Sequence, residues 1–246
     1  MIQWLRSLLH IVQMYVAMLV VAIVFFPFAV LSAAGAHAAC HAFCRWVFWT
    51  LGWMVGLKCE IRGTPPVGEV MIAAKHQSFM DVMAIYNAVP RGKFIIKRQL
   101  MFAPILGQYG LRIGCVPVNR GKRGTAIKKM LTDVRNGKQQ GGQLIIYPQG
   151  TRIAPGVKAP YKAGTGALYD QLGQPCVPVA TNVGVFWPKH GITRKPGVAV
   201  VEFLPQIAPG MAPKAFMAHL EDTIETASNA LLVEAGFRES IDENAD

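Results

Sequence analysis

A long stretch without charge is the feature that most constrains this chain. No Asp, Glu, Lys or Arg lies between Arg6 and Arg45, and residues Leu8–Ala34 are almost entirely apolar. A helix of about 20 apolar residues is long enough to cross a bilayer. A cleavable signal peptide is the alternative, because residues 36–38 resemble a cleavage site, but the apolar run exceeds the roughly 7–15 residues of a signal core. We therefore expect residues 1–62 to form a membrane-associated helical segment.

The sequence leaves two paths of this segment through the membrane. Residues Trp46–Leu57 form a second apolar stretch that is too short to span and is typical of an interfacial or packing helix. Pro27 could bend the first helix so that it dips into one leaflet and returns. Tryptophans, which settle at the headgroup boundary, stand at positions 4, 46, 49 and 53. The sequence does not choose between spanning and insertion into one leaflet.

The charged residues lie in blocks. The formal net charge is +11, and from Arg91 to Lys162 Asp133 is the only acid among many lysines and arginines. Such an excess of positive charge favours binding to an anionic membrane surface, a phosphorylated substrate or nucleic acid. Nucleic acid is disfavoured by the uncharged front and by the lack of a recognisable nucleic-acid module. We expect a membrane and a phosphorylated substrate as partners.

The apolar front contains four histidines and cysteines at helical spacings. His37, Cys40, His41 and Cys44 fall at helical spacings that could in principle hold a metal. No acidic residue lies nearby to orient such ligands, so we expect small packing residues and no metal. The odd number of cysteines, five in all, argues for free thiols.

The rest of the chain alternates between strand-like and helix-like segments. This alternation predicts an α/β domain over residues 63–246, with a mostly parallel mixed sheet flanked by helices and an acidic C-terminal tail. The expected strands are Val70–Ala74, Phe94–Ile96, Cys115–Val118, Gln143–Tyr147, Cys176–Thr181 and Val198–Leu204. The expected helices are Phe79–Ala88, Thr125–Asn136, Thr165–Leu172 and Pro213–Ala235. Sites in such sheets lie beyond the carboxyl ends of the strands.

The first candidate group follows the strand Val70–Ala74. His76 could accept a proton from an attacking hydroxyl while Asp81 orients its ring. A structural interpretation competes for Asp81, because Ser78 and Asp81 form a serine–x–x–acid capping box at a helix start. A third interpretation makes Ser78 a hydrolase nucleophile, but the glycines of a nucleophile elbow are absent beside it.

Three further groups follow later strands. Arg120 precedes the predicted helix Thr125–Asn136, where a guanidinium could bind a phosphate. Gly150, Thr151 and Arg152 form a turn after a buried strand, and turn amides with an arginine could bind a phosphate or an oxyanion. The fourth group, VPVATN around Pro178, is a strand that ends in polar residues.

In content and order these groups resemble the motifs of the 1-acylglycerol-3-phosphate acyltransferases, within the glycerolipid acyltransferase superfamily. The family's first motif, N/H-H-x-S-x-x-D, is matched by KHQSFMD. Its second, an arginine after a strand, is matched by CVPVNRG, and its fourth, an apolar strand with a central proline, by VPVATN. Its third, F-P-E-G-T-R, is matched by YPQGTR except at Tyr147 and Gln149. The likeness runs from about Val70 to Leu204.

The resemblance implies transfer of a fatty acyl group from a thioester, acyl-CoA or acyl carrier protein, to the sn-2 hydroxyl of lysophosphatidic acid. The product would be phosphatidic acid, made for phospholipid synthesis at the cytoplasmic face of the inner membrane. His76 would be the base, oriented by Asp81, and the reaction needs no metal, cofactor or covalent enzyme intermediate. The phosphate would be held by Arg120, Arg152 and Lys97, the last at a position where many bacterial members carry a basic residue.

The family's glutamate in the third motif is assigned to acceptor binding, and here it is Gln149. The resemblance therefore assigns Gln149, Gly150 and Thr151 to the acceptor and the oxyanion, with a neutral amide in place of a carboxylate. This change leaves open another acceptor, such as a lyso-ornithine lipid or another lysophospholipid. A non-catalytic lipid-binding protein is a further alternative, which the intact His76 and Asp81 pair disfavours.

Overall fold

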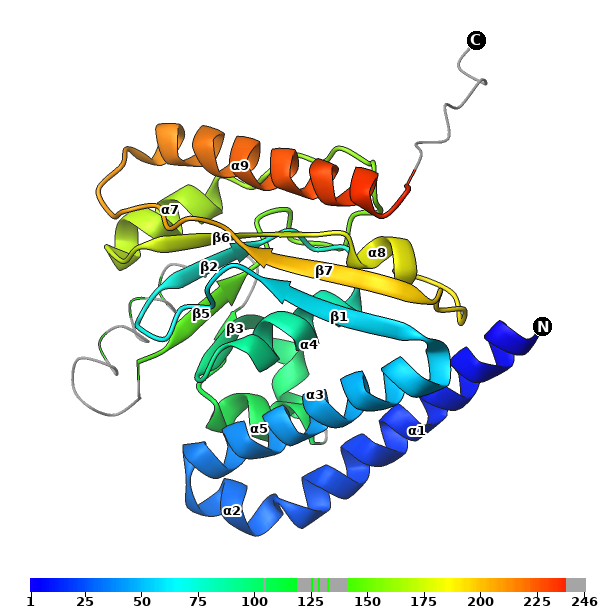
Figure 1. Ribbon diagram of the computed structural model, residues 1–246. Helices are drawn as coiled ribbons and strands as arrows, with labels where there is room; N and C mark the ends of the chain where they lie inside the picture. The colour runs from blue at the N-terminus through cyan, green and yellow to red at the C-terminus, as the bar shows by residue number, and fades with distance from the viewer. Residues whose placement is uncertain (104, 119–124, 126–127, 129–131, 133–140, 238–246) are drawn as a thin grey trace.

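The computed structural model describes residues 1–103, 105–118, 125, 128, 132 and 141–237. Its N-terminal part is a helical hairpin in which α1 (Ile2–Val24) and α3 (Ala33–Val55) run side by side, joined by the short α2 (Phe26–Leu31) (Figure 1). Pro27 lies in the first turn of α2, and Ser32 caps α3 by accepting the N–H of Gly35. The apolar run is thus two antiparallel helices with a bend at Pro27, and residues 46–55 continue the second of them.

Polar contacts hold the two long helices together. Gln13 donates its side-chain amide to the Thr50 hydroxyl at 2.9 Å and accepts the indole N–H of Trp46 at 2.8 Å. Buried Ala36 and Ala39 on α3 allow its backbone a close approach to its neighbours. In the part of the chain that the structure describes, α1 is the one helix long and apolar enough to span a membrane.

The sheet has seven strands in the order β1-β7-β6-β2-β5-β3-β4 among the described residues. The five strands β6, β2, β5, β3 and β4 are parallel, with β4 at one edge, while β7 pairs antiparallel with β6 and carries β1 in parallel at the other edge. This confirms the predicted mostly parallel mixed sheet. The strands are β1 (Leu57–Arg62), β2 (Met71–Ala74), β3 (Gly92–Lys97), β4 (Val116–Val118), β5 (Gln143–Ile146), β6 (Cys176–Thr181) and β7 (Gly197–Phe203).

Helices cover both faces of this sheet. One face packs against α7 (Gly164–Leu172) and α9 (Pro213–Glu234), and the other faces α4 (Phe79–Ala88), α5 (Leu106–Arg112) and the hairpin (Figure 1). Along β2 the buried residues divide accordingly: Ile72 and Ala74 join the core on the α4 side, and Met71 and Ala73 the core under α9. Two short elements complete the fold, η1 (Arg98–Phe102) and α8 (Val183–Phe186).

The predicted segment boundary at residue 62 differs from the structure. Residues Leu57–Arg62 were grouped with the membrane-associated helices, yet they form β1 and pair with Gly197–Glu202 of β7. The sheet therefore begins directly after the Gly56 cap of α3. The alternation of charged and apolar residues in LKCEIR is typical of an edge strand, whose burial is partial. Of the predicted helix over 125–136 only residues 125, 128 and 132 are described, and these are helical.

A substitution in the turn that follows β1 tests how closely this turn packs on β7. Gly63 has a φ of +71°, and a Cβ there would clash with the carbonyl oxygen of Phe203. Gly63→Ala should therefore lower the free energy of unfolding by about 2–4 kcal/mol, since it adds a backbone clash to the strain of a left-handed alanine. Gly173→Ala is the matched control, because its φ is +59° and the space beside it is open. Equal losses of thermal stability in the two variants would contradict the close packing of the turn on β7.

Candidate active site

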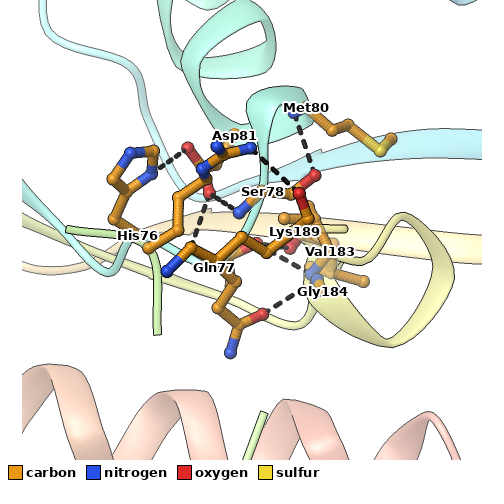
Figure 2. Close-up of polar contacts among 11 residues, drawn as sticks. His76, Gln77, Ser78, Met80, Asp81, Val183, Gly184 and Lys189 are labelled. Atoms are coloured by element: carbon orange, nitrogen blue, oxygen red, sulfur yellow. Dashed lines mark hydrogen bonds and ion pairs between the residues drawn. The ribbon is translucent and has the colours of Figure 1, made fainter. Parts of the chain in front are cut away.

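The loop between β2 and α4 brings His76 and Asp81 together. The Nδ1 atom of His76 lies 2.8 Å from Oδ1 of Asp81, and the Asp81 side chain is fully buried while 16% of the His76 side chain is exposed. Figure 2 shows the imidazole with one nitrogen on the carboxylate and the other turned away from it. An imidazole held in this way has a defined tautomer and a free second nitrogen, which is the geometry of a general base.

Asp81 also has the capping role that competed with its chemical one. Its second oxygen, Oδ2, accepts the backbone N–H groups of Gln77 at 2.8 Å and Ser78 at 2.7 Å (Figure 2). The Ser78 hydroxyl accepts the N–H of Met80 at 3.2 Å, and the capping box is complete. The two interpretations of Asp81 are therefore compatible, because each carboxylate oxygen serves one of them. Ser78 is fully buried at the helix start.

Tyr147 stacks on the imidazole. The ring centroids of His76 and Tyr147 are 4.0 Å apart with an angle of 22° between the planes. Burial, with the neighbouring Asp81 carboxylate as a second cause, raises the pKa of the Tyr147 phenol well above its usual value. The phenol therefore stays neutral, and its ring covers one face of the imidazole and limits the movement of the imidazole. In the sequence Tyr147 stands out only as a departure from a motif, and the aromatic character that it shares with phenylalanine is the signal for this stacking.

The turn after β5 lies beside the histidine. Gly150 has a φ of +71° and donates its N–H to the carbonyl of Tyr147 at 2.9 Å, while Ile153 donates its N–H to the carbonyl of His76 at 2.8 Å. Arg152 is half-buried and donates one guanidinium N–H to the carbonyl of Lys189 at 3.3 Å. These bonds fix the turn against the His76 loop, so the first and third motifs form one site.

Gln149 has a different position from the one expected. Its side chain is 4% exposed and donates a long 3.5 Å bond to the carbonyl of Ala159, and its Oε1 has no partner among the described residues. The described residues that line the cavity include Gly150, Thr151 and Arg152 but not Gln149. The Gln149 side chain is therefore buried in the protein next to Ala159.

The remaining predicted site residues are Arg120, Lys97 and those of the fourth motif. Arg120 lies outside the described residues. Lys97 ends β3 opposite Val118 of β4, so its backbone lies at the carboxyl end of the parallel strands, on the same edge as His76 and Arg152. Its contact with a phosphate stays a prediction. In the fourth motif Asn182 is buried and accepts the N–H of Val200 at 2.7 Å, a structural role at the end of β6.

A cavity of about 730 Å³ opens beside His76. Its walls are mostly apolar and come from α4, β3, α5, β5 and α7 and from the facing sides of α1 and α3. The hairpin residues in this wall are Met18, Val21, Ala22, Ala39, Cys40, Phe43 and Cys44. The N-terminal segment, predicted only as a membrane-associated part, therefore also forms part of the cavity, which sequence periodicity alone did not indicate.

Comparison with known proteins identifies the family. A family model described as acyltransferase matches residues 57–182, about half of the chain. The chain belongs to the acyltransferase family. The matched region of this acyltransferase begins at β1 and ends after β6, so it includes all four motifs.

Individual relatives carry a more specific name. The 1-acyl-sn-glycerol-3-phosphate acyltransferase of Pseudomonas aeruginosa is 29% identical over 175 residues, which cover 70% of this chain and 68% of that protein. The 1-acyl-sn-glycerol-3-phosphate acyltransferase alpha of Mus musculus is 27% identical over 168 residues, 65% of this chain and 59% of that protein. These matches confirm the resemblance expected from the motifs.

A solved structure confirms the fold of this acyltransferase. The crystal structure of the 1-acyl-sn-glycerophosphate (LPA) acyltransferase from Thermotoga maritima superposes with a TM-score of 0.77. It covers 93% of this chain and 97% of the other at 21% identity. The coverage includes most of the helical hairpin, so the hairpin and sheet together form a shared architecture.

Proposed function

We propose that this acyltransferase moves a fatty acyl group from a thioester to the sn-2 hydroxyl of 1-acylglycerol 3-phosphate (lysophosphatidic acid), forming phosphatidic acid. The observation that carries the proposal is the His76–Asp81 pair at the edge of a mostly apolar cavity. A base beside an apolar cavity suits a reaction between a hydroxyl and a long acyl chain. The names of the relatives support the choice of acceptor.

The mechanism follows from the hydrogen bonds of the pair. Asp81 accepts the Nδ1 proton of His76, which leaves the lone pair on Nε2 free to take the proton of the sn-2 hydroxyl. The alkoxide oxygen attacks the thioester carbonyl carbon and forms a tetrahedral intermediate. Collapse breaks the carbon–sulfur bond, and the imidazolium returns its proton to the thiolate that leaves. The new ester and the free thiol account for every atom, and no acyl-enzyme forms.

The oxyanion of the tetrahedral intermediate needs backbone N–H donors that are not already hydrogen-bonded. The Gly150 N–H is donated to Tyr147, so it is not free for this role. Thr151 lies next in the turn, lines the cavity, and its N–H is donated to no described residue. We assign the oxyanion to the Thr151 amide, because preorganised amide donors are the usual means of stabilising such a charge.

The phosphate of the acceptor is assigned to Arg152. Arg152 lines the cavity, and the bond to Lys189 uses one of the five N–H groups of its guanidinium. The remaining donors suit bidentate recognition of a phosphate. Arg120 and Lys97 complete this assignment as predicted from the family motifs. Gln149 is not among the described residues that line the cavity, and the acceptor panel below tests the alternative of a different lysolipid.

The acyl chain is assigned to the cavity, and this assignment makes a prediction. Val82 on α4 is partly exposed and lines the cavity, so Val82→Trp should fill part of it. We expect kcat/KM for long-chain acyl donors to fall about tenfold or more relative to short-chain donors, since the lost space removes apolar contacts. Val67→Trp, at a surface position that is 74% exposed, is the control. An unchanged chain-length profile in Val82→Trp would exclude this cavity as the acyl site.

The helical hairpin is assigned to the membrane. Its outer surface exposes large apolar side chains on all three helices, among them Leu9, Val16, Val20, Phe28, Trp49 and Trp53. Exposed apolar surface of this extent marks a membrane or protein contact, and the tryptophans suit the headgroup region. We propose that the hairpin inserts into the cytoplasmic leaflet of the inner membrane, with the basic residues of the domain on anionic lipid.

A panel of acceptors tests the proposed function. The purified full-length chain is incubated with acyl-CoA or acyl-acyl carrier protein and with lysophosphatidic acid, lyso-ornithine lipid or lysophosphatidylcholine, and the products are identified by mass spectrometry. We expect phosphatidic acid as the major product. Preferential acylation of another lysolipid would overturn the acceptor assignment and leave the acyl-transfer mechanism in place.

A further inference from the structure

A lysine outside all four motifs lies over the Gly150 turn. A Cβ placed on Gly150 would lie 2.5 Å from Nζ and 3.0 Å from Cε of Lys162. The end of the Lys162 side chain therefore occupies the space that a side chain at Gly150 would need. Because Gly150 lines the cavity beside Thr151 and Arg152, the ammonium group lies at the same turn as these residues.

The backbone of Lys162 is fixed on both sides. Its N–H is donated to the carbonyl of Pro148 at 3.0 Å, and its carbonyl accepts the N–H of Thr165 at 2.9 Å. The first bond ties Lys162 to the residue two before Gly150, so the lysine and the turn keep their relative position. The second bond joins it to the first turn of α7.

The preceding residue directs the lysine toward the turn. Tyr161 donates its hydroxyl to Glu225 of α9 at 2.8 Å, and Glu225 also binds the ammonium of buried Lys75 at 2.6 Å. Tyr161 is thus held on the α9 side of the segment. Lys162, the next residue, extends to the Gly150 turn.

The charge of Lys162 is uncompensated within the described part of the chain. The Lys162 side chain is exposed and forms no ion pair with a described residue. The nearby carboxylate, Glu225, is bound to Lys75, and Gln149 in the turn is neutral. An unpaired ammonium at the turn that carries Arg152 favours an anion with several oxygens, and phosphate is such an anion.

We propose that Lys162 contacts the phosphate of the acceptor, together with Arg152, and so determines preference for a phosphorylated lysolipid. This inference rests on the proposed function and adds a specificity-determining residue to it. The glycine at position 150 is required by its positive φ and leaves room for the end of the Lys162 side chain. Lysine supplies a mobile point charge, which suits a phosphate that enters and leaves at each turnover.

Steady-state kinetics of full-length variants tests the proposal, with acceptor and donor concentrations varied separately. Lys162→Met should raise KM for lysophosphatidic acid roughly tenfold, because a charge-assisted hydrogen bond is lost, with kcat and the donor KM little changed. Lys162→Arg should restore most of the affinity. Lys158→Met removes the same charge from an exposed position in the same segment and should behave as the wild type.

The outcomes separate this inference from the function on which it rests. A wild-type chain that does not acylate lysophosphatidic acid overturns the proposed function. A wild-type chain that does, with an unchanged acceptor KM in Lys162→Met, overturns only the role of Lys162. Equal rises in donor and acceptor KM, or a lowered Tm without rescue by arginine, would show a structural role and also overturn it. Lys162→Gln, which keeps much of the side-chain length, replaces the methionine variant if that one fails to fold.

Discussion

His76→Ala should lower kcat by about 10²–10⁴-fold while the protein stays folded. The imidazole is the one group in the described site that is placed to accept the hydroxyl proton, since its Nδ1 is on Asp81 and its Nε2 is free. Its side chain contributes little to the core, because its contacts are the Asp81 carboxylate and the face of Tyr147. The measurement is kcat under saturating substrate, with Tm as the check on folding.

A matched control separates the base from a general effect of histidine removal. His219 lies exposed on α9, away from the cavity lining, and His219→Ala should retain wild-type kcat. Retention of more than about a tenth of wild-type kcat in His76→Ala would contradict the assignment of the general base, since even the smallest expected loss is larger.

Asp81→Asn should lower kcat by about 10²-fold or more, and the reason is the tautomer that it imposes. Oδ2 of Asp81 accepts two backbone N–H groups, so the single oxygen of an asparagine will remain on these amides. The asparagine NH₂ then faces Nδ1 of His76, which must become the acceptor, and the proton moves to Nε2. A protonated Nε2 cannot take the hydroxyl proton.

The same variant has a modest cost in stability. The capping bonds survive with a neutral acceptor, so we expect a loss of about 1–2 kcal/mol in the free energy of unfolding. Asp170→Asn, at an exposed position on α7, is the control for loss of a carboxylate. Wild-type kcat in Asp81→Asn would show that the tautomer of His76 is not set by this residue.

Much of the sheet domain was predictable because its signals are local. The helix Phe79–Ala88 was predicted to the residue, since the Ser78 capping box starts it and Pro90 follows its end. The strand Cys176–Thr181 was predicted equally well from a continuous apolar run between polar residues. The carboxyl ends of parallel strands meet at one edge, and this rule alone placed His76 beside the turn of Arg152.

The features that were missed depend on contacts between distant segments. The edge strand Leu57–Arg62 was missed because its partner, β7, lies about 140 residues later in the chain. The buried position of Gln149 depends on the course of the turn, which a motif letter does not specify. The place of Lys162 over Gly150 depends on Tyr161 being held by α9, a contact between residues 64 positions apart.

We propose that the His76–Asp81 site transfers an acyl group from a thioester to lysophosphatidic acid. Its most direct test is thiol release from palmitoyl-CoA, and in parallel from palmitoyl-acyl carrier protein, by the full-length chain with and without lysophosphatidic acid. We expect thiol release that depends on the acceptor, equals the phosphatidic acid formed, and is lost in His76→Ala. Absence of acceptor-dependent release from both donors, or equal release by His76→Ala, would contradict it.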